Sequence, residues 1–223
     1  MAPMRHNRFT NNTLLELSDI NRNPLFTYED LSIVTLDKVV EELTPFVPDI
    51  LNYVLKAREK CNRDSPLLTL DEAAAIYLYS MSSFYSHLSI LFRSENQHST
   101  KPWFSFLKLL STALKKLPSI EGPFWRGVNY DAALTYVENN EYTFWNVTAC
   151  SKNLNAVKPF LGESGTLFLI DAIHGKDISQ FSAVPDEQEV VLMPGTRVRC
   201  RCNSPDIDDH LFIVHLEEIE PQR

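Results

Sequence analysis

The pattern of apolar residues changes once along this chain, close to residues 118–123. Before Pro118 the apolar residues recur every three or four positions, the spacing of an amphipathic helix that buries one side. After the segment EGP, residues 121–123, short runs rich in β-branched and aromatic residues alternate with Gly, Pro, Asn and Asp, which is typical of strands and turns. These runs follow one another too closely for regular strand–helix–strand winding. We therefore expect an α+β fold in which helices come first and an antiparallel or mixed β-sandwich follows.

The expected elements can be placed along the chain. The segment TLDE, residues 69–72, predicts a capping box at the start of one long amphipathic helix that runs to about residue 92. Further helical patterns are VVEEL near residue 40, ILNYVLKAREK from residue 50 and WFSFLKLLSTALKKL from residue 103, the last ended by Pro118. The strand-like runs are FWRGV, YTFWNVTACS, GTLFLIDAI, EQEVVLM, TRVRCRC and HLFIVHLEEI, with brief helical pieces at about 131–138 and 154–161.

Composition limits the partners of the protein. The 223 residues are 44% hydrophobic, which supports a substantial core. With 21 Lys and Arg against 29 Asp and Glu, the net charge is −8, the wrong balance for neutralising nucleic-acid phosphates. No apolar run is long enough to span a bilayer, and the opening MAPMRHNRFTNN lacks the apolar middle of a secretory signal. We expect a monomer with no nucleic-acid partner and no membrane segment, either intracellular or secreted after trimming.

The numbers and spacing of cysteines and glycines limit which metal and nucleotide sites the chain can form. The four cysteines, Cys61, Cys150, Cys200 and Cys202, are too few and too irregular for a disulfide scaffold. Cys200 and Cys202 form a C-x-C pair without a second pair of ligands, so TRVRCRC is better interpreted as a half-buried strand than as a zinc site. With only 6 glycines the chain has neither a P-loop nor a glycine-rich dinucleotide fingerprint. We expect no metal site, and any bound nucleotide must be held by something other than a glycine-rich loop.

Two glutamates open one of the apolar runs. In PDEQEVVLMPG, residues 185–195, Glu187 and Glu189 stand two apart. On a strand, residues two apart point to the same face at a separation of roughly 6 to 7 Å, so the two carboxylates would share one small volume. The alternative is an exposed strand end with two solvated acids.

An arginine lies in the middle of another aromatic, strand-like run. Arg126 follows Phe124 and Trp125 and precedes Gly127. A guanidinium in such surroundings needs an anion or an acidic partner. The alternative to an anionic ligand is a core carboxylate, for which either glutamate of the pair is a candidate.

Three segments in order, FWRGV, WNVTACS and PDEQEVVLMPG, resemble the signature segments of the arginine-type mono-ADP-ribosyltransferases. In that family an arginine ends an aromatic strand, a Ser-Thr-Ser-like strand follows, and Glu-x-Glu leads into an apolar strand that ends in proline. LTLDEAAAIYLY also resembles the helices that precede the sandwich in animal members. The resemblance implies a single domain over 1–223, with a helical part at about 27–118 and an NAD-binding β-sandwich core at about 122–220.

The resemblance implies a set of site residues and a reaction. It implies that NAD is the substrate and that a protein with an exposed arginine accepts the ADP-ribose. Arg126 would bind the NAD phosphates, Gly127 would let the backbone approach the nicotinamide, and Phe160 would lie against the nicotinamide. Glu189 would be the catalytic carboxylate, and Glu187 would be the residue that faces the acceptor, within the turn and loop from about Ser179 to Glu189.

The chain departs from the family at one position of the serine triplet, which falls on Ala149, Cys150 and Ser151. The family's first serine hydrogen-bonds the catalytic glutamate, and Ala149 cannot donate. Ser151 shares a strand face with Ala149 whereas Thr148 does not, so we expect Ser151 to take over this role. Two alternatives stay open: an enzyme that mainly hydrolyses NAD, for which Glu189 alone would suffice, and an NAD-binding or interaction module that has lost its activity through Ala149.

Overall fold

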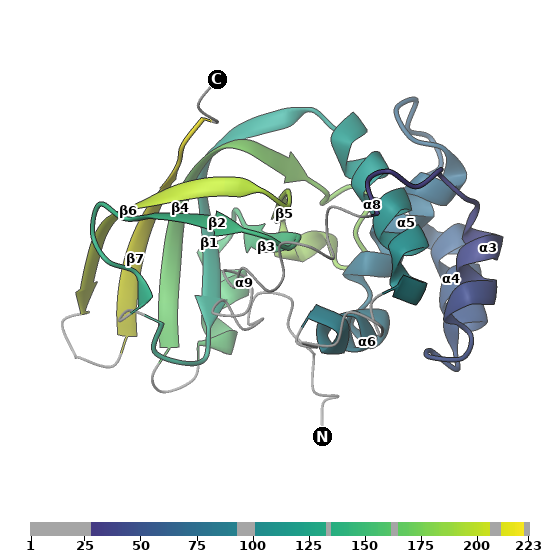
Figure 1. Ribbon diagram of the computed structural model, residues 1–223, viewed down its shortest axis with the longest axis horizontal. Coiled ribbons are helices and arrows are strands. Elements are labelled where there is room, and N and C mark those ends of the chain that lie inside the picture. The colour runs from purple at the N-terminus through teal and green to yellow at the C-terminus, as the bar shows by residue number, and fades with distance from the viewer. Residues whose placement is uncertain (1–27, 93–100, 133–134, 162–164, 206–210, 221–223) are drawn as a thin grey trace.

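The computed structural model describes residues 28–92, 101–132, 135–161, 165–205 and 211–220. Helices occupy the first part of the chain and gather on one side of the molecule, while the strands form the other side (Figure 1). The helices are α3 (Leu36–Leu43), α4 (Ile50–Lys60), α5 (Leu70–Ser80), α6 (Ser82–Phe92) and α8 (Phe104–Lys116), with the 3₁₀ turn η3 (Lys101–Trp103) before α8. The predicted order of helices before strands is confirmed for the described residues.

The strands of the described residues form one hydrogen-bonded sheet. They are β1 (Ser119–Val128), β2 (Glu141–Phe144), β3 (Thr148–Ser151), β4 (Gly165–Asp177), β5 (Glu189–Leu192), β6 (Thr196–Pro205) and β7 (Leu211–Glu218). The strand order is β1-β3-β5-β4-β7-β6-β2, and β1 pairs with β4 as well. The strands β1, β3, β5 and β4 therefore close into a small barrel-like ring. Of the pairings, β4 with β7 is parallel and the others are antiparallel. The description as a two-sheet sandwich is not confirmed.

Short helical pieces connect the strands near the ring. The helix α9 (Leu154–Val157) runs into the 3₁₀ turn η5 (Lys158–Phe160), as the sequence predicted for 154–161. A second 3₁₀ turn, η6 (Pro185–Glu187), precedes β5. The helical piece predicted at 131–138 includes two residues outside the described ones, and among the described ones the Thr135 amide bonds to the Ala132 carbonyl at 3.0 Å.

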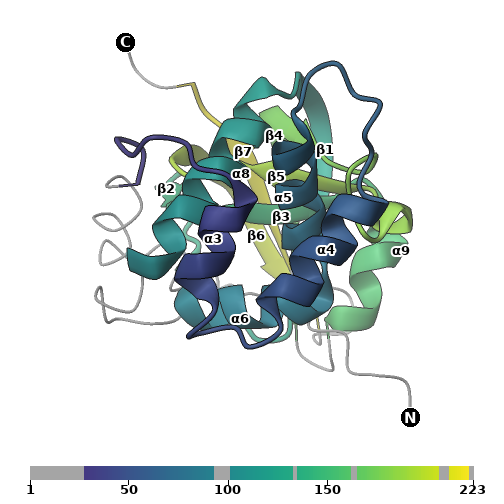
Figure 2. The same ribbon diagram turned by 90° about the vertical axis from the view of Figure 1, so that its right-hand side faces the viewer.

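The helix α5 is the centre of the helical part and is buried along most of its length (Figure 2). Its capping box is present as predicted, because Thr69 accepts from the Glu72 amide and Glu72 accepts from the Thr69 amide. Glu72 also pairs with Lys116 of α8 at 2.7 Å. Burial alone raises the pKa of Glu72, but hydrogen bonds from Lys116 and Thr69 outweigh it, so the pKa lies below its usual range. These contacts fix the start of α5 on α8.

The single long helix predicted after Thr69 is wrong, because the chain leaves the helical conformation at Met81 (φ −73°, ψ 121°) and α6 begins at Ser82. The Ser80 hydroxyl donates to the Tyr77 carbonyl at 2.8 Å. In a continuing helix that carbonyl would accept from the Met81 amide, which instead bonds to the Leu78 carbonyl at 3.1 Å. The Ser80 hydroxyl thus occupies the carbonyl that the Met81 amide does not use where α5 ends.

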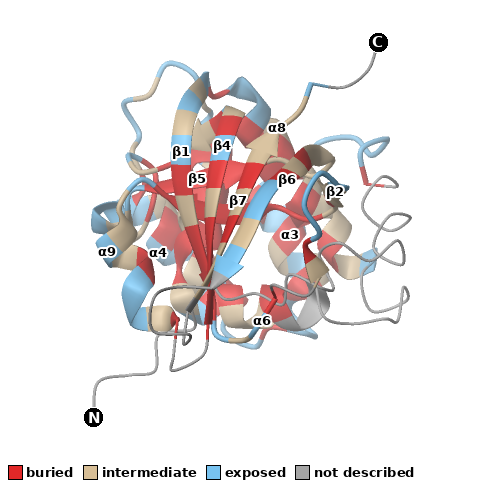
Figure 3. Ribbon diagram, turned by 90° about the vertical axis from the view of Figure 1, so that its left-hand side faces the viewer, coloured by how far each residue is buried: buried red, intermediate tan, exposed pale blue. Residues whose placement is uncertain are grey.

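The helical and strand-rich parts share one apolar core. Its members from the helices include Leu36, Val54, Ile76 and Phe106, and the strand part contributes Val147, Ile178, Phe181 and Val191. A second core fills the space among the strands and contains Phe124, Phe144 and Phe168. Figure 3 shows the strands from the side away from the helices.

The strand β6 has the half-buried character that its alternating sequence predicted. Cys200 is buried and Cys202 is exposed, with an irregularity of the β6–β7 pairing between them. Both thiols are free. Within the described ranges, no group of three or more His, Cys, Asp or Glu side chains could hold a metal ion.

Candidate active site

Three of the strands in the barrel-like ring place Trp125, Ser151 and Glu189 side by side. Trp125 of β1 is the partner of Ser151 of β3, and Ser151 is the partner of Glu189 of β5. Residues directly opposite in antiparallel strands point to the same face. Ser151 and Glu189 are fully buried. The structure therefore brings together two of the predicted site residues, Ser151 and Glu189, and adds Trp125, which the sequence analysis did not assign.

Glu187 does not lie on the strand, so the expectation of two carboxylates on one strand face is wrong. Glu187 is the last residue of η6, and Gln188 takes the left-handed conformation (φ 46°, ψ 49°) before β5 begins at Glu189. Pro185 starts η6, and the amides of Glu187 and Gln188 bond to the carbonyls of Val184 and Pro185 at 3.1 and 3.0 Å. Side chains alternate between the two faces only along a continuous strand, so Glu187 and Glu189 need not point to the same face across this turn. Glu187 is half-buried, whereas Glu189 is fully buried.

The Ser151 hydroxyl holds the turn that carries Glu187. It donates to the Glu187 carbonyl at 2.6 Å and accepts from the Asn153 amide at 2.9 Å. In the described part of the chain it bonds only to backbone atoms. The expectation that Ser151 hydrogen-bonds to the Glu189 carboxylate is therefore wrong. The left-handed turn at Gln188 brings the Glu187 carbonyl over the end of β3, where the hydroxyl meets it.

Arg126 is buried, with 1% of its surface exposed, next to the point where β1 and β3 separate. Its Nη1 donates to the Ala149 carbonyl at 2.9 Å. The guanidinium thus satisfies a main-chain carbonyl of β3. Ala149 itself is buried and pairs with Val191 of β5.

Gly127 allows a close approach of α9 and η5 to β1. A Cβ atom at Gly127 would lie 2.7 Å from Val157 Cγ1 and 2.9 Å from Leu161 Cδ2. Real Cβ atoms do not come so close to other atoms, so a larger residue would force the Val157 and Leu161 side chains to shift. The glycine therefore allows the segment that ends in Phe160 to pack directly on β1.

A hollow of about 430 Å³ lies between the α9–η5 segment and η6, and it brings Phe160 and Glu187 to one site. Its other lining residues are Asn153, Asn155, Ala156, Pro159, Val184 and Asp186. Asp186 and Glu187 give its wall an acidic side. Arg126, Gly127, Ala149, Ser151 and Glu189 are not among its lining residues.

Asn153 connects the hollow to the buried rung of Ser151 and Glu189. Its amide bonds to the Ser151 hydroxyl, and its side-chain oxygen caps α9 by accepting from the Asn155 amide at 3.0 Å. The sequence analysis missed this residue. The signal was an asparagine directly before a short apolar helical piece, which is a common N-cap pattern.

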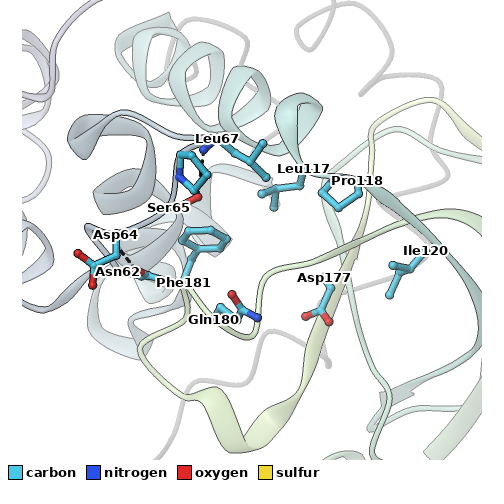
Figure 4. A pocket seen from close by; sticks show the side chains of 11 residues that line it. Asn62, Asp64, Ser65, Leu67, Leu117, Pro118, Ile120, Asp177, Gln180 and Phe181 are labelled. Carbon is cyan, nitrogen blue, oxygen red and sulfur yellow. Dashed lines mark hydrogen bonds between the residues drawn. The ribbon is translucent and has the colours of Figure 1, made fainter.

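A second hollow, of about 560 Å³, lies on the side of the β4–β5 connection that faces the helical part (Figure 4). It is lined by Asn62, Asp64, Ser65, Pro66, Leu67, Leu117, Pro118, Ile120, Asp177, Gln180 and Phe181. Asp177 pairs with Lys152 at 2.5 Å. Burial raises the pKa of Asp177, but hydrogen bonds from Lys152 and Ser179 outweigh it, so the pKa lies below its usual range. The connection that carries Glu187 thus separates two hollows.

Solved structures with the same fold are known. The type III effector XopAI from Xanthomonas axonopodis pv. citri has a TM-score of 0.66 and 18% identity, over 92% of this chain and 100% of that chain. Exoenzyme S from Pseudomonas aeruginosa, in complex with human 14-3-3 protein beta and bound to Carba-NAD, has a TM-score of 0.60 and 19% identity, over 82% and 88%. The eucaryotic mono-ADP-ribosyltransferase ART2.2 has a TM-score of 0.64 and 15% identity, over 99% and 98%. A search of the curated proteins finds no match.

The fold, with helices before a barrel-like sheet and an acidic turn leading into a buried strand, is that of the ADP-ribosyltransferases. The model of one family, NAD:arginine ADP-ribosyltransferase, matches residues 52–222. The chain belongs to this family, as its three signature-like segments predicted. NAD is the substrate of these transferases. In the described part of the chain, no helix is both long and apolar enough to cross a membrane.

Proposed function

We propose that the protein transfers ADP-ribose from NAD to arginine side chains of a protein acceptor and releases nicotinamide. The observation that carries the proposal is the pairing of a fully buried glutamate with a half-buried one in the adjoining turn. Glu189 lies fully buried on a rung with Ser151 between β3 and β5, and Glu187 lines the neighbouring hollow. One carboxylate is thus shielded from water, and the other is accessible to an incoming group.

Glu189 is the proposed catalytic carboxylate. NAD, when bound, supplies a bond between nicotinamide and ribose whose cleavage develops positive charge on the ribose. A buried carboxylate stabilises such a charge more strongly than a solvated one, because water does not screen the interaction. Glu189, which has no exposed surface, meets this requirement.

Glu187 is the proposed base for the acceptor. A guanidinium is protonated at neutral pH and attacks only if a nitrogen loses its proton as the new bond forms. The Glu187 carboxylate lines a hollow that is open to an acceptor side chain, and its negative charge favours a cation there. In NAD hydrolysis the acceptor is water, so no base is needed to take a proton from a guanidinium. The division of labour therefore separates transfer from hydrolysis.

The remaining proposed contacts are with NAD. Arg126 would contact its phosphates through the planar guanidinium fork, Gly127 and Ala149 would approach the nicotinamide, and Phe160 would pack against it. The hollow that Phe160 lines, about 430 Å³, is within the size range of small-molecule sites. Ser151 would act through the Glu187 turn that it holds.

We further propose that 1–223 is a single ADP-ribosyltransferase domain, with a helical part at about 27–118 and an NAD-binding core at about 122–220. The apolar core that joins α5 and α8 to Ile178, Phe181 and Val191 supports this proposal. A core shared by both parts makes independent folding of either part unfavourable.

The experiment is to measure nicotinamide release from NAD by the purified protein, with and without agmatine, a small guanidine. We expect agmatine to accelerate the release and to become ADP-ribosylated, which mass spectrometry detects. Release that is indifferent to agmatine would indicate an NAD hydrolase instead. Absence of release under both conditions would indicate an inactive NAD-binding module, for which Ala149 at the family's serine position would be the first residue to test.

A further inference from the structure

The connection between β4 and β5, residues 178–188, is held at its two ends by strand residues. At the start, the Ile178 amide bonds to the Glu189 carbonyl at 3.0 Å, and Asp177 accepts from the Ser179 amide and hydroxyl at 2.9 and 2.6 Å. At the end, the Lys152 amide bonds to the Gln188 carbonyl at 3.1 Å. Together with the Ser151 hydroxyl, which donates to the Glu187 carbonyl, these bonds fix where the connection leaves and rejoins the sheet, but none of them reaches residues 180–184 in its middle.

The middle of the connection is held by the helical part. The Ala183 amide donates to the hydroxyl of Ser80, the last residue of α5, at 2.6 Å. Phe181, two residues earlier, is 6% exposed and packs into the core that the helices share with the strands. Ala183 stands only four residues before Glu187. The Ser80 bond is therefore a link from the helices to the turn that carries the proposed base.

Ser80 is well placed to fix the position of Ala183. It is fully buried, and its hydroxyl uses its proton on the Tyr77 carbonyl while its oxygen accepts from Ala183. The same hydroxyl lies at the end of α5, and the other end of α5 is held by the capping box and by the Glu72–Lys116 pair. The oxygen of Ser80 is thus presented to the connection from a rigid, buried helix.

We propose that Ser80 is a positioning residue for acceptor modification, which acts through the Ala183 amide to place Glu187 at its hollow. This inference rests on the proposed function, in which Glu187 is the base for the acceptor and Glu189 serves both transfer and hydrolysis. Glu189 is placed by the β3–β5 ladder, of which Ser80 is not a part. Loss of the Ser80 bond should therefore impair transfer to a guanidine and spare NAD hydrolysis.

The test is the ratio of agmatine modification to NAD hydrolysis in Ser80→Ala, with both products measured in the same reaction. Both reactions take place on the same folded molecules, so the ratio does not depend on how much protein is folded. We expect the ratio to fall by about three- to tenfold, the range expected for one neutral hydrogen bond. The KM for NAD should stay within about twofold of wild type, on the same scale.

Two further variants control for effects on the helices. Ser89→Ala removes a buried hydroxyl that donates to the carbonyl three residues earlier, as Ser80 does, but in α6; its ratio should equal that of wild type. Ser80→Thr keeps the oxygen and should keep the ratio near wild type even if its melting temperature falls. An unchanged ratio in Ser80→Ala, or an equal fall in Ser89→Ala, overturns the inference. A wild-type protein that does not modify agmatine overturns the proposed function itself, whatever the variants show.

Discussion

Two glutamates two residues apart have different surroundings in this protein. Glu189 has no exposed surface and lies on the β3–β5 ladder, whereas Glu187 is half-buried in a 3₁₀ turn at a hollow. The left-handed Gln188 between them separates the strand from the turn. A single turn thus gives two neighbouring carboxylates different surroundings, one fully buried and one at a hollow, and the proposed division of labour rests on this difference.

The first prediction concerns Glu189→Gln. The amide keeps the size of the side chain and one acceptor oxygen, but removes the charge that stabilises a cationic ribose. Loss of such an electrostatic group lowers rates by about 10² to 10³. We expect both transfer to agmatine and NAD hydrolysis to fall by this amount, measured as nicotinamide release. Wild-type rates in a folded variant would remove Glu189 from the mechanism.

The second prediction concerns Glu187→Gln. The ribose cation would still be stabilised by Glu189, but the guanidinium would lose its base, and general-base catalysis contributes about 10² to 10⁴ in rate. We expect transfer to agmatine to fall much more than hydrolysis. Asp186→Asn is the matched control, since Asp186 is an exposed acid of the same turn and lines the same hollow. Equal losses of transfer and hydrolysis in Glu187→Gln would contradict a division of labour between the two glutamates.

The third prediction concerns Arg126→Lys, which replaces a planar fork with a single ammonium. If Arg126 contacts the NAD phosphates, the KM for NAD should rise and the melting temperature should change little. Arg126 also donates to the Ala149 carbonyl, so a purely structural role is the alternative that the experiment must distinguish. A large loss of stability with an unchanged KM would show that the arginine only fastens β1 to β3.

At the level of single residues, the family resemblance predicted that Ser151 and Glu189 belong to one site, and the structure puts them on one rung. The hydroxyl partner of Ser151 could not be predicted, because it depends on the left-handed conformation of Gln188. A glutamine there gives no local sign of that conformation, since glycine and asparagine are the residues that favour it.

Among the elements, α5 has the clearest sequence signature and a clear physical consequence. Its capping box was predicted from TLDE and is present. Its end was not predicted, because the apolar spacing continues through Met81 into α6. The Ser80 hydroxyl bonds to the Tyr77 carbonyl at this break, but Ser86 and Ser89 make the same kind of bond inside α6, where the helix continues, so a serine in an apolar helical pattern does not mark a break.

The fourth prediction tests the capping box. Thr69→Ala removes the side-chain acceptor of the Glu72 amide at the start of α5. Substitution of a threonine cap by alanine costs about 0.5 to 2 kcal/mol, so we expect the free energy of unfolding in urea to fall by that amount. The control is Thr112→Ala, since the Thr112 hydroxyl bonds to the Lys108 carbonyl within α8 and caps no helix end. A smaller loss in Thr69→Ala than in Thr112→Ala would show that the cap does not stabilise α5.

At the scale of the whole molecule, the sequence predicted the order of helices and strands but not the closure of the sheet. Closure depends on β1 pairing with both β3 and β4, contacts between segments far apart in the chain. Periodicity reports which residues of a strand are buried, and it carries no information on which strand lies next to it. The core that joins Phe181 and Val191 to the helices is likewise a product of packing that no single segment encodes.

The last prediction concerns the pH dependence of stability. Glu72 joins α5 to Lys116 of α8, and Asp177 joins β4 to Lys152 after β3. For each carboxyl, burial raises the pKa, but the hydrogen bonds outweigh it, and the folded pKa lies below the ordinary values of 4.5 and 3.8. The unfolded chain therefore binds these protons first as the pH falls, so the stabilisation is present above the ordinary pKa values and is lost as the pH falls through the folded ones.

We expect the urea midpoint to be nearly constant between about pH 7 and 5.5 and to fall steadily below about pH 4.5. The double variant Glu72→Gln, Asp177→Asn has no charge to lose at these two positions. It should therefore be less stable than wild type at neutral pH, and its midpoint should decline less steeply in acid. Exposed carboxyls are present in both proteins and cancel in the comparison. One is that of Glu141, whose pKa is lowered by a hydrogen bond from Arg199, against the effect of burial, and by a further hydrogen bond from Arg197. Parallel curves of urea midpoint against pH would show that the two carboxyls contribute nothing to the loss of stability in acid. The charges of the Glu72–Lys116 and Asp177–Lys152 pairs would then be replaceable by neutral hydrogen-bonding groups.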